Sequence, residues 1–204
     1  SKHYNKEIII KEINTTGDNK IDIRLSELGG KGLFSKNIEN ELLNKNIDLA
    51  VHALKDLPSF DTEGLVTNCF LKRNNSNEVM ISNSNKKLND LFPGSIIGTS
   101  SFRREFQLKR IRKDLNFKLI RGNVDTRIRK LKNGEYDAII LAKAGLSSLN
   151  LDKEITQEFS NNDLIPSAGQ GTIAVQCRKD DVEIIELLNK INHEKTSICV
   201  KAER

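Results

Sequence analysis

The order helix, short apolar strand, polar turn occurs twice in the sequence, and it constrains the fold more than any other feature. In the first copy, apolar residues spaced three and four apart over 33–43 predict one buried helical face, and residues 47–51 predict a strand. In the second copy, a helix over 124–131 stops at Gly134, and residues 137–142 predict the next strand. Such alternation is typical of α/β proteins.

Further elements extend this pattern along the chain. Residues 95–100 predict a strand before a helix that begins at Ser101, and residues 172–177 predict a strand before a helix over 180–191. Residues 7–10 are a strand-like apolar run. The polar, breaker-rich segments 72–76 and 166–171 bracket the second copy as hinges would. We therefore expect two similar lobes with mixed, largely parallel sheets joined by a double hinge, with residues 1–71 and 172–193 in the first lobe and residues 77–165 in the second.

Composition excludes several classes of function. The net charge of +5 suits anionic partners without selecting among them. Cys69, Cys177 and Cys199 form no Cys-x-x-Cys pair and the three histidines form no His-x-x-x-His group, so we expect neither a disulfide framework nor a metal site. No apolar run approaches the roughly 20 residues that cross a bilayer. We expect a cytoplasmic protein, or a plastid one if a targeting segment has been lost.

Two arginines lie in the first turn of the helix that begins near Ser101. Arg103 and Arg104 there oppose the helix macrodipole at a cost of a few tenths to about 1 kcal/mol each, which an anion would offset. The free amides of the helix start, the hydroxyls of Thr99, Ser100 and Ser101, and two guanidinium forks predict an anion-binding site. An ordinary helix with a serine cap and Glu105 as partial compensation is the alternative.

Other candidate residues lie at the ends of the predicted strands. Arg121 precedes Gly122, and the spacing of Arg127 places it beside the buried face of its helix. The pair Lys55 and Asp56 follows the strand over 47–51, where a carboxylate among cations can stabilise a positive charge on a substrate. A surface salt bridge is the alternative for that pair.

The glycine-rich segment 29–32 fits neither of the common nucleotide-binding glycine patterns. It is either a flexible loop that brings Lys31 and Phe34 to a cleft between the expected lobes, or the start of a helix with a solvated lysine. We interpret His52 and Cys177 as structural.

Five motifs, in this order and spacing, resemble the porphobilinogen deaminase (hydroxymethylbilane synthase) family, and the similarity covers essentially all 204 residues. They are LGGKGLF at 28–34, AVHALKDLP at 50–58, GTSSFRR at 98–104, RGNVDTR at 121–127 and SAGQG at 167–171. The resemblance implies a transferase of tetrapyrrole (haem) biosynthesis. It would join four porphobilinogen units, with loss of ammonia, into hydroxymethylbilane on a covalently attached dipyrromethane primer whose side chains are acetates and propionates.

The resemblance also implies roles for individual residues. Asp56 would be catalytic and would stabilise the cationic pyrrole species. The residues implied to bind the dipyrromethane cofactor are Lys55, Asp56, Thr99, Ser101, Arg103, Arg104, Arg121 and Gly122. Those implied to bind the substrate are Lys31, Phe34, Arg127 and Gln170. Electrostatic positioning of carboxylates would be the mechanism.

The sequence departs from the family pattern at several points. The family attaches its primer through a cysteine in a third domain, and none of the three cysteines here matches it. We expect residues 194–204 to be the start of a truncated third domain, the family's amino-terminal strand to be missing, and the chain as given to be an incomplete, inactive form. Ala53 stands where bacterial members often have serine. Ser148 stands where an arginine is usual, which should weaken carboxylate binding.

Two other functions remain as alternatives. A non-catalytic, two-lobed receptor of the periplasmic-binding-protein kind also clamps anions between α/β lobes and would need only the arginines. Nucleic-acid binding through Lys109, Arg110 and Arg112 is disfavoured by the few aromatic residues and the lack of a recognisable module. We expect a monomer that binds porphobilinogen and neither nucleic acid nor membrane.

Overall fold

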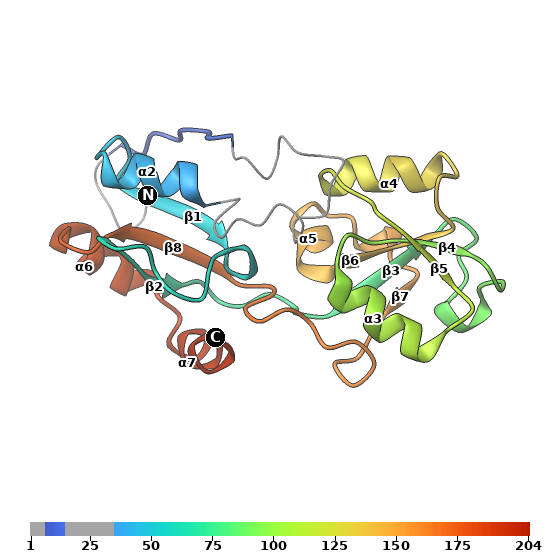
Figure 1. The fold of residues 1–204 in the computed structure, drawn as a ribbon. Coiled ribbons are helices and arrows are strands. Elements are labelled where there is room, and N and C mark those ends of the chain that lie inside the picture. The colour runs from blue at the N-terminus through green and yellow to red at the C-terminus, as the bar shows by residue number, and fades with distance from the viewer. Residues whose placement is uncertain (1–6, 15–34) are drawn as a thin grey trace. The chain divides into compact units, whose positions relative to one another are not determined.

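The computed structural model describes residues 7–14 and 35–204, which fall into two compact units (Figure 1). The described part of the first unit comprises residues 7–14, 35–73 and 172–204, and that of the second comprises residues 74–171. The chain therefore enters the second unit after residue 73 and returns to the first after residue 171. The boundaries of the predicted lobes, hinges and third domain stay predictions; the structure places residues 194–203 in a helix of the first unit.

The first unit contains a three-stranded sheet in the order β1 (Leu49–Ala53), β8 (Ile173–Arg178), β2 (Leu65–Phe70), with both pairings antiparallel. Alternate residues of β8 face opposite sides. Val175 and Cys177 pack with α6 (Val182–Ile191), whereas Gln176 lies against α2 (Lys36–Leu43). Two further elements complete the unit: η2 (Leu54–Asp56), a single 3₁₀ turn directly after β1, and α7 (Glu194–Glu203), which packs on β2.

The second unit is built on a five-stranded sheet, ordered β5 (Asn116–Lys118), β4 (Ile96–Gly98), β6 (Ala138–Ala142), β3 (Glu78–Ser82), β7 (Gln157–Glu158). One face buries Met80 and Ile140 with Leu108 of α3 (Phe102–Ile111). The other face buries Ile139 with Ile128 of α4 (Val124–Lys132) and Leu146 of α5 (Lys143–Ser148). Short 3₁₀ turns η3 (Leu88–Asp90) and η4 (Asp152–Glu154) lie in the connections.

The predicted α/β class with mixed sheets is confirmed, but the sheets are less parallel than expected. Among the described strands, parallel pairing is confined to β4 with its neighbours β5 and β6. The strands β3 and β8 begin shortly after the chain passes from one unit to the other, and each runs antiparallel to its neighbours. A continuous apolar run is equally compatible with a buried strand of either direction, so the sequence pattern could not reveal this reversal.

The strand-like run at residues 7–10 forms no strand. Ile8, Ile9 and Ile10 are 64%, 84% and 87% exposed, and no described strand pairs with them. The prediction rested on β-branched composition, which stabilises a strand only where a neighbour completes the hydrogen bonds and covers the side chains. None of the helices in residues 7–14 and 35–204 is long and apolar enough to span a membrane.

Candidate functional site

The carboxyl ends of β4, β5 and β6 meet at one edge of the sheet in the second unit. Gly98 at the end of β4 pairs in parallel register with Lys118 of β5 and Ile139 of β6. One step further on, the Thr99 amide donates to the Lys118 carbonyl at 3.1 Å. The turns over 99–101 and 119–122 and the start of α5 at Lys143 therefore leave the sheet side by side, the arrangement in which open α/β sheets bind ligands.

The hydroxyls of Thr99 and Ser101 shape the first of these turns. The Ser101 side chain caps α3 by accepting a hydrogen bond from the Arg104 amide at 3.4 Å. The Ser101 amide in turn donates to Thr99 Oγ1 at 3.2 Å, and Thr99 is only 1% exposed. Both hydroxyls thus hold the entry of the chain into α3. The helix start predicted at this position is confirmed.

Arg103 and Arg104 share one carboxylate, that of Glu78 at the start of β3. Arg104 Nη2 lies 2.7 Å from Glu78 Oε2, and Arg103 Nη2 bonds Glu78 Oε1. Arg104 Nη1 also donates to the Ile140 carbonyl at 3.1 Å, and Arg103 Nη1 donates to the Ile165 carbonyl. The first turn of α3 is therefore tied both to the sheet and to the segment that leads back to the first unit.

Glu78 is fully buried, with 0% of its surface exposed. Burial alone raises the pKa of its carboxyl, but the charge and hydrogen bond of Arg104, with those of Arg103, outweigh burial and hold the pKa below its ordinary value. Sequence reasoning missed Glu78. The available signal was a carboxylate directly before the apolar run 79–81, because a charge at such a position needs a partner when the strand is buried.

The cluster of Glu78, Arg103 and Arg104 keeps an excess of positive charge, because one carboxylate cannot neutralise two guanidiniums. The Arg103 side chain is 30% exposed and that of Arg104 is 8% exposed. Arg104 Nε is buried and finds no hydrogen-bond partner within the described ranges. A spare buried donor and a residual positive charge suit an anionic group, and a carboxylate or phosphate matches the geometry of the fork. The donor set therefore fits a carboxylate-bearing cofactor.

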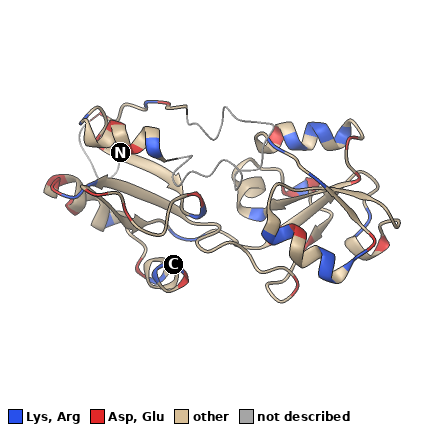
Figure 2. Ribbon diagram, in the orientation of Figure 1, with Lys and Arg blue, Asp and Glu red and all other residues tan. Residues whose placement is uncertain are grey.

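Arg121 and Gly122 form the second turn at this edge. Arg121 is 7% exposed, and Gly122 adopts a φ of +109°, where a Cβ atom would lie 2.8 Å from Thr126 Cγ2. The position therefore requires glycine. Arg127 Nε donates to the Gly122 carbonyl at 2.7 Å, so part of its guanidinium braces the turn. Lys and Arg are frequent along α3 and α4 (Figure 2), so the two helices that begin at these turns both carry an excess of positive charge.

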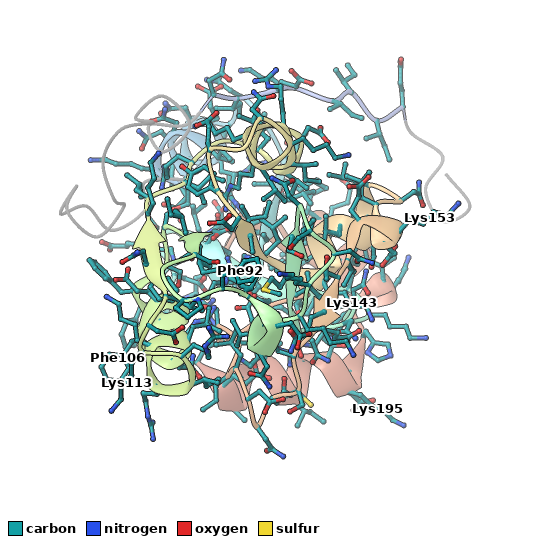
Figure 3. The ribbon with its side chains drawn as sticks, turned by 90° about the vertical axis from the view of Figure 1, so that its right-hand side faces the viewer. Phe92, Phe106, Lys113, Lys143, Lys153 and Lys195 are labelled. Atoms are coloured by element: carbon teal, nitrogen blue, oxygen red, sulfur yellow. The ribbon has the colours of Figure 1, made fainter. Side chains whose placement is uncertain are left out.

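The two flanks of α3 differ in their exposure to solvent. Phe106 is 68% exposed and, with Lys113, lies on the outside of the ribbon (Figure 3). Arg104 and Leu108, on the other flank, are buried. The helix thus turns one cationic residue of its first turn inward, although a charge in that position usually points to water.

Lys55 and Asp56 lie in the first unit, on the 3₁₀ turn η2. Lys55 is half-buried and Asp56 is exposed. The Leu54 amide donates to the Thr172 carbonyl at 2.9 Å, and the Leu57 amide donates to the Leu54 carbonyl at 3.1 Å, so the turn is anchored on both sides. The predicted site residues therefore fall into two groups, one in each unit. Lys31 and Phe34 lie outside the described residues.

Gln170 and Ser148 both make contacts that hold the backbone. Gln170 is 1% exposed, and its Nε2 donates to the Ser76 carbonyl at 2.7 Å, which joins the two segments where the chain enters and leaves the second unit. Ser148 Oγ donates to the Ala144 carbonyl at 2.9 Å within α5. Lys143, at the start of α5, pairs with Glu158. The structure thus gives Gln170 a structural contact that its proposed substrate role did not anticipate.

The buried histidine and the two buried cysteines have environments that favour their uncharged forms, although His52 lies near enough to Asp56 to be affected by its charge. His52 lies inside β1, and burial lowers the pKa of its imidazole more than Gln176 and the nearby carboxylates raise it. Burial likewise raises the pKa of Cys69 and of Cys177, which keeps both thiols protonated and unreactive. Cys199 is exposed on α7.

Comparison with known proteins gives a consistent family. The sequence model described as "Porphobilinogen deaminase, dipyromethane cofactor binding domain" matches residues 1–186. Porphobilinogen deaminase of Bacillus pumilus is 50% identical over 196 residues, covering 96% of this chain and 63% of the relative. That of Macrococcus caseolyticus is 48% identical over 204 residues, covering 100% of this chain and 66% of the relative. The chain thus spans just under two thirds of the length of these curated relatives.

Among solved structures, a lipoprotein from Bacillus subtilis is similar with a TM-score of 0.50 and 16% sequence identity. The match covers 79% of this chain and 76% of the lipoprotein. At this identity the likeness concerns the fold alone, and it agrees with the predicted two-lobed α/β architecture.

Proposed function

The chain belongs to the porphobilinogen deaminase family, and we propose on that basis that the full-length protein is a transferase of haem biosynthesis. It joins four porphobilinogen units head to tail, with loss of one ammonia for each unit, into the linear tetrapyrrole hydroxymethylbilane. Both the substrate and the dipyrromethane primer of the family carry acetate and propionate side chains. The site must therefore hold several carboxylates at once while a positive charge develops on a pyrrole.

The observation that carries this proposal is the cluster of Arg103, Arg104 and Glu78 at the carboxyl edge of the parallel strands. Glu78 fixes both guanidiniums yet leaves one positive charge over, and Arg104 Nε stays available as a donor. Preorganised cations cost little reorganisation when an anion binds, which is what positioning by electrostatics requires. A salt bridge that balanced its own charges would not attract a carboxylate.

We assign the dipyrromethane cofactor to residues of the two groups, most of which present a cation or a hydrogen-bond donor. When bound, it supplies the end to which pyrrole units are added. The proposed cofactor residues are Lys55, Asp56, Thr99, Ser101, Arg103, Arg104, Arg121 and Gly122. The described residues proposed for the substrate are Arg127 and Gln170, each of which also makes a structural hydrogen bond. Asp56, exposed on its anchored turn, is proposed to stabilise the cationic pyrrole.

Ammonia release from porphobilinogen by the full-length protein tests this proposal. Asp56→Asn keeps the shape of the side chain but removes its charge, and kcat should fall by on the order of a hundredfold to a thousandfold. Glu63→Gln is the matched control, because Glu63 is an exposed carboxylate in the same unit. Equal turnover in the two variants would remove Asp56 from the mechanism.

The same experiment separates the enzyme from the two-lobed receptor. Binding of porphobilinogen without ammonia release, in protein whose intact mass includes a covalent dipyrromethane, would favour the receptor. The expectations of a monomer, of a cytoplasmic location and of no binding to nucleic acid or membrane stay predictions.

A further inference from the structure

The end of α7 contacts the backbone of the turn that carries Lys55 and Asp56. Arg204 Nη1 donates to the Leu54 carbonyl at 2.9 Å, and Arg204 Nη2 donates to the Pro58 carbonyl. These carbonyls stand immediately before Lys55 and two residues after Asp56. One planar guanidinium thus holds both ends of the turn.

Apolar packing places Arg204 at this point. Val200 of α7 is fully buried in a cluster with Leu54, Leu57, Phe70 and Ala174. Leu54 and Leu57 flank the Lys55–Asp56 pair in the sequence. The helix that packs against these two leucines therefore also leads to the guanidinium of Arg204. The cluster fixes the position of the turn, and the fork fixes the distance between its ends.

A second set of contacts secures α7 itself, without the turn. The Arg73 amide donates to Thr196 Oγ1 at 3.1 Å near the start of the helix, and the Arg73 guanidinium pairs with Glu203 near its end. The His193 side chain caps the helix by accepting a hydrogen bond from the Thr196 amide at 3.2 Å. Loss of Arg204 should therefore leave α7 in place.

The chemistry of Arg204 suits a brace on the backbone. Burial lowers the pKa of its guanidinium, although the charge of Asp61 raises it, and the group offsets its desolvation by bonding two carbonyl oxygens. A guanidinium presents its donors in a rigid plane and can bridge two acceptors at a fixed spacing. A lysine ammonium on a flexible stem cannot impose that spacing.

We propose that Arg204 is a positioning residue, which braces the carbonyls of Leu54 and Pro58 so that the turn presents Lys55 and Asp56 to the ligand. The inference rests on the proposed function for the role of Asp56, but the brace itself is a property of the first unit. Arg204 acts through the backbone of the turn.

Hydrogen exchange in the full-length protein tests the brace directly. In Arg204→Ala the Leu57 amide, which donates to the Leu54 carbonyl, should exchange at least about tenfold faster, since the turn loses a hydrogen bond from a charged donor. The Ser197 amide, which donates to the His193 carbonyl in α7, should keep its protection. Lys201→Ala, which removes an exposed cation from the same helix, is the control and should change neither amide. Faster exchange at both Leu57 and Ser197 would mean that Arg204 merely holds α7, and unchanged exchange at Leu57 would also overturn the proposal.

Kinetics then connect the brace to turnover. Misplacement of a reacting group by about 1 Å costs up to roughly a hundredfold in rate, so Arg204→Ala should lower kcat by about tenfold to a hundredfold with KM within about twofold. Millimolar guanidinium ion should restore part of the loss. If Arg204→Ala does not fold, Arg204→Lys keeps the charge without the fork and should still lower kcat. A normal kcat in a folded variant would overturn the proposal. Absence of turnover in the wild type would instead contradict the proposed function. The hydrogen-exchange result would then still show whether Arg204 braces the turn.

Discussion

Removal of Glu78 should destabilise the second unit more than the loss of any surface carboxylate. In Glu78→Ala a methyl group replaces the carboxylate that pairs with two arginines, so both guanidiniums lose this ionic partner. Arg104, whose side chain is 8% exposed, would stay buried with the Ile140 carbonyl as its remaining acceptor. Arg103 is 30% exposed and can turn toward water.

The expected magnitude follows from that difference in exposure. Breaking a buried ion pair by removing one partner costs about 3–5 kcal/mol, because the other charge is left uncompensated. Most of this cost comes from Arg104, since the side chain of Arg103 is 30% exposed and can regain hydration by turning toward water. Glu78→Gln keeps one acceptor oxygen and should lose about half as much. Domains are stable by only about 5–15 kcal/mol, so Glu78→Ala should approach the limit of folding.

Urea unfolding followed by tyrosine emission measures this loss in the second unit alone. The chain has no Trp and two Tyr, of which Tyr136 is buried in the second unit, so a Tyr4→Phe background leaves Tyr136 as the reporter. With an m-value of about 2 kcal/mol per M, a loss of 3–5 kcal/mol lowers the midpoint by about 2 M. Glu154→Gln, which breaks the surface pair with Lys132, is the control and should change stability by less than about 1 kcal/mol.

The pH dependence provides an independent check. The folded pKa of Glu78 lies below its ordinary value of 4.5, so the stabilising contribution is present above pH 4.5 and is lost as the pH falls through the folded pKa. Glu78→Gln should flatten this part of the acid limb. If Glu78→Ala and Glu154→Gln unfolded at the same urea concentration, the reasoning from burial and charge would be refuted.

Two further predictions concern the glycine turn and the thiols. Gly122→Ala should lower the free energy of unfolding by about 1–3 kcal/mol, because φ is +109° and the new Cβ would lie 2.8 Å from Thr126 Cγ2. Urea unfolding measures this loss, and a loss below about 0.5 kcal/mol would argue against backbone strain at this position. Cys199 should react with a chromogenic disulfide reagent in the native protein, whereas Cys69 and Cys177 should react only after unfolding, because burial raises the pKa of both thiols. The absorbance of the thiolate that the reagent releases counts the reactive cysteines. Fast reaction of more than one of these three thiols would contradict the burial of Cys69 and Cys177.

Most of the fold could be predicted from local pattern. The helices near 36–43, 102–111 and 124–132 and the strands near 49–53, 138–142 and 173–178 lie close to their expected positions, because apolar spacing and glycine or proline stops act within a few residues. The strand predicted at residues 7–10 was wrong because strand formation depends on residues outside the run. Its composition favours a strand, but a strand needs a partner, and the partner is not encoded in the run itself.

The candidate site was predictable in its positions but not in its contacts. The first turn of α3, which follows β4, and the turn after β5 hold the expected arginines, since the ends of parallel strands meet at one edge wherever such a sheet forms. The sequence pattern could not show that Arg104 points inward to Glu78, 26 residues earlier, or that Arg204 reaches Leu54, 150 residues earlier. Helical spacing relates residues three and four apart, and these contacts lie far beyond that range.

The reversed strand direction and the missed carboxylate have one origin. β3 begins shortly after the chain enters the second unit, and it runs antiparallel to β6, so its first residue, Glu78, pairs with Ala142 at the carboxyl end of β6. That end lies at the same sheet edge as the first turn of α3. A parallel β3 would have carried its first residue to the opposite edge, away from both arginines. The antiparallel entry of this strand is therefore what supplies the buried anion that orients the cations of the proposed carboxylate site.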